Sequence, residues 1–273
     1  MENSNTNYTD QKINAKVIED FLPKPWTEIQ ELTTKKFQEL TQDQSKILFC
    51  FDYDGTLVDL ATENIVSPGK LPAQTANLLN QLIMKQPVAI ITGRQLKNLK
   101  LLIDDQLDPR IKLFGTHGAE MGEEITDNQY QDQLQSIQAE LAQESDIEFE
   151  AKQISLTIHY INHPNPEPLL SKLHQLATSF QEIFRIQEGR DFFEFLPKDI
   201  NKGMAIHHLQ SQHPAHYLTY FGDDLTDNYA FEAVNHYGGL SSQVSKRIKA
   251  SQAGYLINKV SDLHALIASY LEI

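Results

Sequence analysis

The chain has 273 residues, of which 40% are hydrophobic, so it can bury one large core or two smaller ones, as expected for one or two domains. Its formal net charge of −14 argues against nucleic acid and anionic membranes as partners, because both bind clustered Lys and Arg. The single cysteine, Cys50, excludes an intramolecular disulfide and a cysteine-based zinc site. No apolar run approaches the ~20 residues of a membrane span, and Met1–Asp10 lacks the features of a signal peptide, so we expect a cytoplasmic protein.

The N-terminal segment, residues 1–45, divides into a tail and a helix. Met1 to Asn14 is rich in Asn, Thr and Asp and has no apolar periodicity, which is typical of a disordered tail. Apolar residues then recur at helical spacing and predict a helix over Trp26–Leu40, with Thr27 and Gln30 in a capping-box pattern. Such a helix either packs against the main domain or docks a partner.

A buried strand that ends in two aspartates opens the main domain. Ile47–Phe51 is an apolar run without alternation, as expected of a central strand covered on both faces. Asp52 and Asp54 follow it, before Gly55 breaks the strand, and both would leave the sheet on the same side at its carboxyl edge, where ligands bind. Two such close carboxylates repel unless a cation lies between them, and hard oxygen ligands favour Mg²⁺.

The same stretch also fits part of a calcium-binding loop. Asp52, Asp54, Thr56 and Glu63 would occupy positions 1, 3, 5 and 12 of that loop. Its sixth position requires glycine, however, and carries Leu57, and the loop should follow a helix rather than an apolar strand. The pattern therefore favours the strand-end interpretation.

Alternating helices and strands follow, which is the pattern of a parallel sheet with right-handed crossovers. The predicted elements of this first part of the core, residues 46–115, are the helix Gln74–Lys85, the strand Val88–Ile91, the helix Gln95–Ile103 and the strand Ile111–Phe114. The strand Val88–Ile91 ends directly before Thr92-Gly93-Arg94.

The pattern changes over residues 116–199, which we predict to be an α+β unit inserted into the core. Its predicted elements are two helices, Gln131–Gln143 and Glu167–Phe180, and four strands, Ile147–Lys152, Ser155–Tyr160, Phe184–Gln187 and Phe192–Leu196. In Ser155–Tyr160, apolar and polar residues alternate, which favours antiparallel strands with one open face.

The core pattern returns over residues 200–273. The predicted elements are helices at Gly203–Gln212, Asn228–His236 and Asp262–Leu271, a strand at Tyr217–Phe221, and short apolar stretches at Gly239–Val244 and Gly254–Ile257. Lys202 stands at the start of the first of these helices, and the acidic loop Gly222–Asp227 follows the strand. The fold class is therefore α/β, with a parallel sheet and a second, inserted unit.

Four short motifs should thus meet at one edge of the sheet. They are Asp52-Tyr53-Asp54-Gly55-Thr56, Thr92-Gly93-Arg94, Lys202 and Gly222-Asp223-Asp224-Leu225-Thr226-Asp227. In this order, each after the expected element, they resemble the motifs of the haloacid dehalogenase-like (HAD) phosphatases. The resemblance implies a Rossmann-like HAD core with an inserted α+β cap of the C2 type.

The resemblance also implies phosphate-ester hydrolysis through an aspartyl-phosphate. Asp52 is the implied nucleophile, and Asp54 the implied acid and base. The implied cofactor is Mg²⁺, held by the carboxylates of Asp52 and Asp223 and by the backbone carbonyl of Asp54. An acidic residue at Asp54 is typical of the phosphatases and phosphomutases of the superfamily, whereas its ion pumps carry Thr.

Further residues complete the implied core site. Thr92, the Gly93 amide and Lys202 would bind the phosphoryl group. Asp227 and Asp224 would support the metal site from outside its ligand shell.

Blocks outside the catalytic set resemble the trehalose-6-phosphate phosphatase family, from Ile47 to the C-terminus. They are Gly115-Thr116-His117-Gly118-Ala119-Glu120, Glu150-Ala151-Lys152, Leu156–Tyr160 and Phe193–Pro197 with Asn201-Lys202-Gly203. In that family the insert is a cap that closes over the core and recognises the sugar. The resemblance implies sugar contacts from Lys152 and Glu194, and substrate-binding roles for Arg94 and for His117 and Glu120 at the cap hinge.

The chain departs from the family at one place, and other functions stay open. Ser242-Gln243-Val244-Ser245 stands where the family usually has Val-Lys-hydrophobic-Gly. The leading prediction is hydrolysis of trehalose 6-phosphate, with functional coupling to a trehalose-phosphate synthase. The alternatives are hydrolysis of sucrose phosphate or mannosylglycerate phosphate, a phosphomannomutase-like isomerisation, and a scaffold without catalytic activity.

Overall fold

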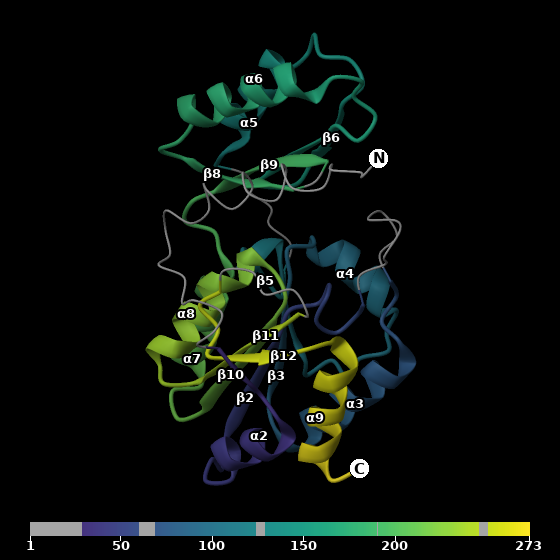
Figure 1. The fold of residues 1–273 in the computed structure, drawn as a ribbon, viewed down its shortest axis with the longest axis vertical. Coiled ribbons are helices and arrows are strands. Elements are labelled where there is room, and N and C mark those ends of the chain that lie inside the picture. The colour runs from purple at the N-terminus through teal and green to yellow at the C-terminus, as the bar shows by residue number, and fades with distance from the viewer. Residues whose placement is uncertain (1–28, 60–68, 124–128, 190, 246–250) are drawn as a thin grey trace, which may run out of the picture. The chain divides into compact units, whose positions relative to one another are not determined.

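The structure is a computed structural model that describes residues 29–59, 69–123, 129–189, 191–245 and 251–273. Its contacts divide the chain into two compact units, which are described separately (Figure 1). The described residues of the larger unit, the core, are 29–59, 69–123, 201–245 and 251–273, and those of the smaller unit are 129–189 and 191–200. The helices in the described part of the chain are too short or too polar to cross a membrane.

The core is built on a sheet of eight strands in the order β1-β12-β11-β10-β2-β3-β4-β5. The pairs are parallel except for β4 and β5. The strands are β1 (Gln30–Glu31), β2 (Ile47–Phe51), β3 (Val88–Ile91), β4 (Lys112–Gly115), β5 (Glu120–Met121), β10 (Tyr217–Gly222), β11 (Leu240–Val244) and β12 (Tyr255–Ile257). The predicted parallel sheet is confirmed, and β2 lies inside it with every residue buried.

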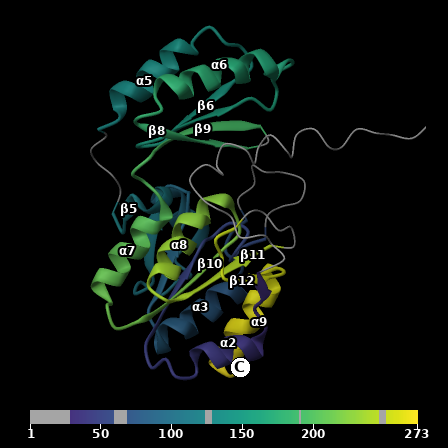
Figure 2. The same cartoon turned by 60° about the vertical axis from the view of Figure 1, so that its left-hand side comes forward.

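Helices cover both faces of this sheet, because the strand residues are apolar on both sides. Ile47, Phe49 and Phe51 of β2 pack in one hydrophobic cluster, whereas Leu48 and Cys50 point into another. The helices of the first cluster are α2 (Thr34–Thr41), α3 (Ala73–Lys85), α4 (Leu96–Ile103) and α9 (Val260–Leu271), and those of the second are α7 (Lys202–Gln212) and α8 (Asn228–His236) (Figures 1 and 2).

The N-terminal helix was predicted too long. Residues 30–31 form β1, which pairs with β12, and α2 begins only at Thr34 with Thr33 as its N-cap. The predicted capping box is therefore wrong at Gln30, while Trp26, Thr27, the Met1–Asn14 tail and Glu63 lie outside the described residues. Phe37 of α2 is fully buried against aromatic rings of the core, so the helix packs on its own domain.

The smaller unit is a four-stranded antiparallel sheet with two helices on one face (Figure 2). The strand order is β6-β7-β9-β8. The elements are α5 (Gln131–Glu140), β6 (Glu148–Ala151), β7 (Leu156–His159), α6 (Pro166–Ser179), β8 (Phe184–Glu188) and β9 (Phe192–Pro197). Leu156 and Ile158 pack into the apolar cluster of this unit, as their alternation predicts.

The turn that begins at Thr116 lies in the core unit, although we placed the start of the insert there. Residues Thr116–Gly118 form a short 3₁₀ turn, and the chain then returns as β5, which pairs antiparallel with β4. The pairing adds an eighth strand to the core sheet, so the contacts assign residues up to 123 to the core.

Candidate active site

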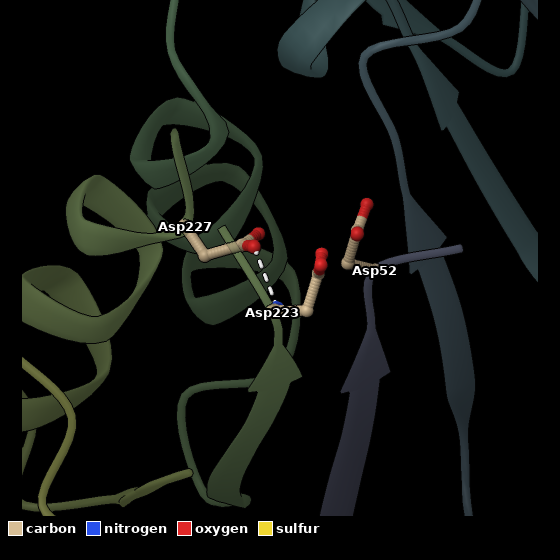
Figure 3. Close-up of side chains that lie close together, drawn as sticks. All are labelled: Asp52, Asp223 and Asp227. Carbon is tan, nitrogen blue, oxygen red and sulfur yellow. Dashed lines mark hydrogen bonds between the residues drawn. The ribbon is translucent and has the colours of Figure 1, made fainter. Parts of the chain in front are cut away.

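The ends of two neighbouring strands place the central acids of the site. β2 and β10 pair in parallel with Phe221 opposite Phe51, so Asp52 and Asp223 emerge from the same edge of the sheet. Figure 3 shows their carboxyl groups pointing the same way, whereas Asp227 turns its carboxyl group toward the backbone of Asp223. Oxygen atoms of these three side chains lie within 4.8 Å of one another.

The carboxyl group of Asp227 is occupied by four hydrogen bonds. Its Oδ1 accepts from the Tyr220 hydroxyl at 2.6 Å and from Lys202 Nζ at 2.7 Å, and its Oδ2 accepts from the backbone N–H groups of Asp223 and Asp224 at 2.9 Å each. Asp227 is fully buried. It therefore fixes the acidic loop and the lysine, and both of its oxygens are engaged by donors of the protein itself.

Lys202 joins the two strand ends through charge. It stands at the start of α7, is 2% exposed, and its Nζ donates to Asp52 Oδ1 at 2.7 Å as well as to Asp227. Burial alone would lower the pKa of Lys202, but the Asp227 and Asp52 carboxylates outweigh burial and raise it above its usual value. The lysine is therefore held in its charged form.

The cluster carries more negative charge than one lysine can balance. Burial is the largest cause that raises the pKa of Asp52, to about 7, and Lys202 only partly opposes it. Burial, followed by the charges of Asp52 and Asp227, raises the pKa of Asp223 well above its usual value. Two buried carboxyl groups and a half-buried one beside a single ammonium group suit an added cation, and the donor set of hard oxygens fits a divalent metal ion.

Gly55 makes room for this cluster. Its φ of +76° lies in the left-handed region that favours glycine, and a Cβ at this position would overlap the carboxyl group of Asp223. The tight turn after β2 therefore depends on glycine twice, once for its backbone and once for the space beside Asp223.

Arg94 lies against Asp54, the predicted acid and base. Its Nε donates to Asp54 Oδ2 at 2.6 Å and its Nη2 to Asp54 Oδ1 at 2.8 Å, in a bidentate ion pair. The two side chains are 27% and 31% exposed, so the pair lies at the border of solvent. We expected Arg94 among the substrate-binding residues, and the structure places it beside Asp54, just after the end of β2.

The Thr92–Arg94 loop follows β3 as predicted and lies against the turn that contains His117. Thr92 is 1% exposed, and its Oγ1 accepts from the Arg94 N–H at 3.2 Å. The backbone N–H of His117 donates to the Thr92 carbonyl at 2.9 Å, and the His117 ring covers the Cα of Gly93. His117 and Glu120 are both buried in the core unit, 5% and 3% exposed.

Asp224 serves as a local cap. Its Oδ1 accepts from the N–H of Leu225 at 2.7 Å, and together with Asp227 it forms a capping box around the short 3₁₀ helix Leu225–Asp227. Its part in the site is to shape the loop that carries Asp223.

In the smaller unit, Lys152 and Glu194 form an ion pair. Lys152 Nζ lies 2.9 Å from Glu194 Oε1, and the Ser155 hydroxyl donates to the same oxygen at 2.8 Å. The carboxyl group is on the sheet face away from the apolar cluster, because Glu194 alternates with Phe193 and Phe195 of that cluster. The two residues predicted to contact the sugar are thus brought together.

The family assignment rests on residues 50–261, which match the family model for trehalose-phosphatase. The chain belongs to the trehalose-phosphatase family. It is 29% identical over 242 residues to trehalose-6-phosphate phosphatase of Escherichia coli (strain K12), covering 84% of this chain and 88% of that protein.

Solved structures show the same fold. The C-terminal domain of Candida albicans trehalose-6-phosphate phosphatase has a TM-score of 0.73 at 19% identity, over 90% of this chain and 98% of that one. The Aspergillus fumigatus trehalose-6-phosphate phosphatase has a TM-score of 0.67 at 21% identity, over 89% and 99%. The predicted fold class, an HAD-like core with a second α+β unit, is confirmed.

Two supporting residues of this trehalose-phosphatase chain were missed from the sequence. Tyr220 was seen only as part of a strand, although its hydroxyl is the shortest contact of Asp227. Gln243, at the place where the chain departs from the family pattern, is 1% exposed and donates from Nε2 to the backbone carbonyl of Asp223 at 3.3 Å. The available signal for both was a large polar side chain within a short stretch that otherwise reads as a buried strand.

Proposed function

We propose that the chain hydrolyses trehalose 6-phosphate to trehalose and inorganic phosphate through an aspartyl-phosphate, as the last step of trehalose biosynthesis. Family membership supports a phosphoric monoester hydrolase. The observation that carries the mechanism is the buried cluster at the carboxyl edge of the sheet, where Lys202 contacts Asp52 and Asp227 and Asp223 lies alongside.

We propose Mg²⁺ as the cofactor, held by the carboxylates of Asp52 and Asp223 with the backbone carbonyl of Asp54. The ion would supply positive charge beside the phosphoryl oxygens and relieve the repulsion between the two acids. The excess of carboxyl groups over basic groups in this cluster supports the proposal, as does the preference of Mg²⁺ for oxygen ligands.

Asp52 is proposed to attack phosphorus with a carboxylate oxygen. The bond from phosphorus to the sugar oxygen breaks, and that oxygen takes a proton from Asp54. Asp54 then accepts a proton from a water molecule, whose oxygen attacks phosphorus of the aspartyl-phosphate, breaks its bond to Asp52 and releases inorganic phosphate. Arg94, which donates to both oxygens of Asp54, would hold the carboxylate that remains after Asp54 has given its proton and that acts as the base in the second step, and it would add positive charge near the substrate.

The phosphoryl oxygens are proposed to bind the Thr92 hydroxyl, the Gly93 N–H and Lys202. These groups supply donors of the kind that stabilise charge in phosphoryl transfer. Lys152 and Glu194 are proposed to bind hydroxyl groups of the sugar, since a charged pair on the sheet face away from the apolar cluster offers both donors and acceptors to them. A trehalose-phosphate synthase would supply the substrate, which is the proposed basis of their coupling.

Release of inorganic phosphate from a panel of sugar phosphates, with and without Mg²⁺, tests the proposal. We expect trehalose 6-phosphate to be the best substrate and the reaction to require the metal ion. Preference for sucrose phosphate or mannosylglycerate phosphate would contradict the substrate assignment. Conversion of a hexose phosphate to its isomer without phosphate release would contradict the hydrolase.

A further inference from the structure

The turn from Gly115 to Glu120 has a strained backbone, which surrounding contacts must stabilise. Thr116 and His117 are consecutive residues with φ of +45° and +56°, although neither is glycine. Side chains with a Cβ rarely adopt this left-handed region, least of all a β-branched one such as Thr116. Such conformations persist where the surrounding contacts determine them, and they gather near functional sites.

The backbone of this turn is bonded to the predicted phosphate loop. The His117 N–H donates to the carbonyl of Thr92 at 2.9 Å, and the Thr116 N–H donates to the carbonyl of Arg94 at 2.7 Å. The Thr92 carbonyl and the Gly93 N–H belong to one planar trans peptide, so they point in opposite directions. By holding the carbonyl on one side, the turn aims the Gly93 N–H to the other.

Glu120 ties this turn to the helix that follows the loop. Its Oε2 accepts from the Thr116 hydroxyl at 2.6 Å and from the N–H of Leu96, the first residue of α4, at 2.8 Å. Gln95, the N-cap residue of α4, makes no side-chain capping bond, so Glu120 satisfies a helix N–H from a distant part of the chain. A Cβ on Gly115 would lie 2.5 Å from that same oxygen, so glycine leaves it room.

We propose that Glu120 and Thr116 are positioning residues for phosphate binding. They hold the strained turn, the turn holds the carbonyls of the Thr92–Arg94 loop, and the loop presents its N–H and hydroxyl groups to the phosphoryl oxygens. The inference rests on the proposed phosphate-binding role of this loop, and it gives Glu120 a task other than direct contact with the sugar.

If Glu120 only stabilised the fold, its loss would lower stability without a specific effect on phosphate binding. Loss of two buried hydrogen bonds lowers stability wherever they lie in the core. Asn80 offers a matched control, because its side chain also makes two hydrogen bonds to a loop of the core, with the Gln106 carbonyl at 2.8 Å and the Asp108 N–H at 2.7 Å. Only the loss at Glu120 should weaken phosphate binding.

Binding of inorganic phosphate in the presence of Mg²⁺, measured by calorimetry, is the deciding experiment, with kinetics as a second readout. We expect Glu120→Ala to raise the dissociation constant of phosphate about tenfold, and to lower kcat/KM for trehalose 6-phosphate and for p-nitrophenyl phosphate by the same factor. Asn80→Ala should change the dissociation constant of phosphate and kcat/KM by no more than about twofold, although its melting temperature should fall about as much as that of Glu120→Ala. Glu120→Gln should restore most of the affinity, because an amide oxygen can accept both hydrogen bonds.

Thr116 gives a second pair of variants if Glu120→Ala does not fold. Thr116→Val removes only the hydroxyl and should weaken phosphate binding, whereas Thr116→Ser keeps the hydroxyl and should restore it. Phosphate affinity that stays within about twofold of the wild type in Glu120→Ala and Thr116→Val would overturn the inference. This test measures phosphate binding and does not depend on which sugar the protein accepts. If the wild-type protein were inactive on trehalose 6-phosphate, the substrate assignment would fail, and that result is distinct from a failure of this inference.

Discussion

The carboxyl edge of the core sheet and the face of the smaller unit's sheet away from its apolar cluster both carry buried charges, but they are built differently. At the core edge, acids from two strand ends share one lysine, and Asp227 alone accepts four hydrogen bonds. On the smaller sheet, one lysine Nζ lies 2.9 Å from one carboxyl oxygen. The core edge suits an added cation and a phosphoryl group, and a pair that offers both donors and acceptors suits neutral hydroxyl groups.

The largest effect should come from Asp52, the proposed nucleophile at the core edge. Asp52→Asn removes a carboxylate at nearly constant volume, so we expect turnover to fall by about 10³-fold or more on every substrate, with the fold intact. Steady-state phosphate release from trehalose 6-phosphate and p-nitrophenyl phosphate measures this. Retention of more than about one per cent of activity would contradict covalent catalysis through Asp52.

The second acid tests whether the core edge holds a metal ion. Asp223→Ala should abolish most activity by weakening Mg²⁺ binding, since the remaining carboxylate offers too little charge. Calorimetric titration with Mg²⁺ measures the binding. Without Mg²⁺, the variant should unfold no more easily than the wild type, because the mutation removes a carboxyl group that its neighbours repel. An unchanged wild-type rate in excess EDTA would make the metal assignment wrong.

The contrast also explains what the sequence could predict. Asp52 and Thr92 directly follow predicted buried strands, and Asp223 follows one after Gly222; because parallel strands end at one edge, their proximity followed from the pattern. Lys202 begins a helix instead, so it was placed with them by the order of the motifs in the HAD resemblance. The parallel order of the sheet and the antiparallel smaller unit were likewise encoded in uninterrupted and alternating apolar runs.

Contacts set by tertiary structure could not be predicted. β1 has only two residues, and it exists because β12, over 220 positions later, offers its edge. The ion pair of Arg94 with Asp54 and the bond from Glu120 to Leu96 depend on side chains that meet across 40 and 24 positions. No local periodicity or motif spacing specifies which partner such a side chain takes.

Variants of the charged pair in the smaller unit should affect some substrates and not others, unlike variants of the core edge. Lys152→Ala and Glu194→Gln should each lower kcat/KM for trehalose 6-phosphate by roughly 10²-fold, about 3 kcal/mol, because each loses hydroxyl contacts. Activity on p-nitrophenyl phosphate should barely change, since that ester has no sugar. The double variant should lose less than the sum of the two, because the side chains contact each other. Equal losses on both substrates would show that the pair maintains the fold instead.

The smallest effect should come from Tyr220, whose hydroxyl lies behind the core acids. Tyr220→Phe removes the 2.6 Å donor to Asp227 and leaves Lys202 and two backbone N–H groups on that carboxylate. A hydrogen bond to a charged group is worth about 1.5–3 kcal/mol, so we expect the free energy of unfolding to fall by about 2 kcal/mol.

Tyr160→Phe is the matched control in the smaller unit, where the hydroxyl donates to backbone carbonyls at 3.4 and 3.5 Å. It should cost roughly 0.5 kcal/mol or less, since long bonds between neutral groups contribute little. Urea unfolding of both variants measures the difference. The kcat of Tyr220→Phe should fall by less than about tenfold, because three donors still orient Asp227. If Tyr220→Phe and Tyr160→Phe lowered the free energy of unfolding equally, the hydrogen bond to the charged Asp227 would contribute no more than a bond between neutral groups. The contrast between the two regions would then not hold.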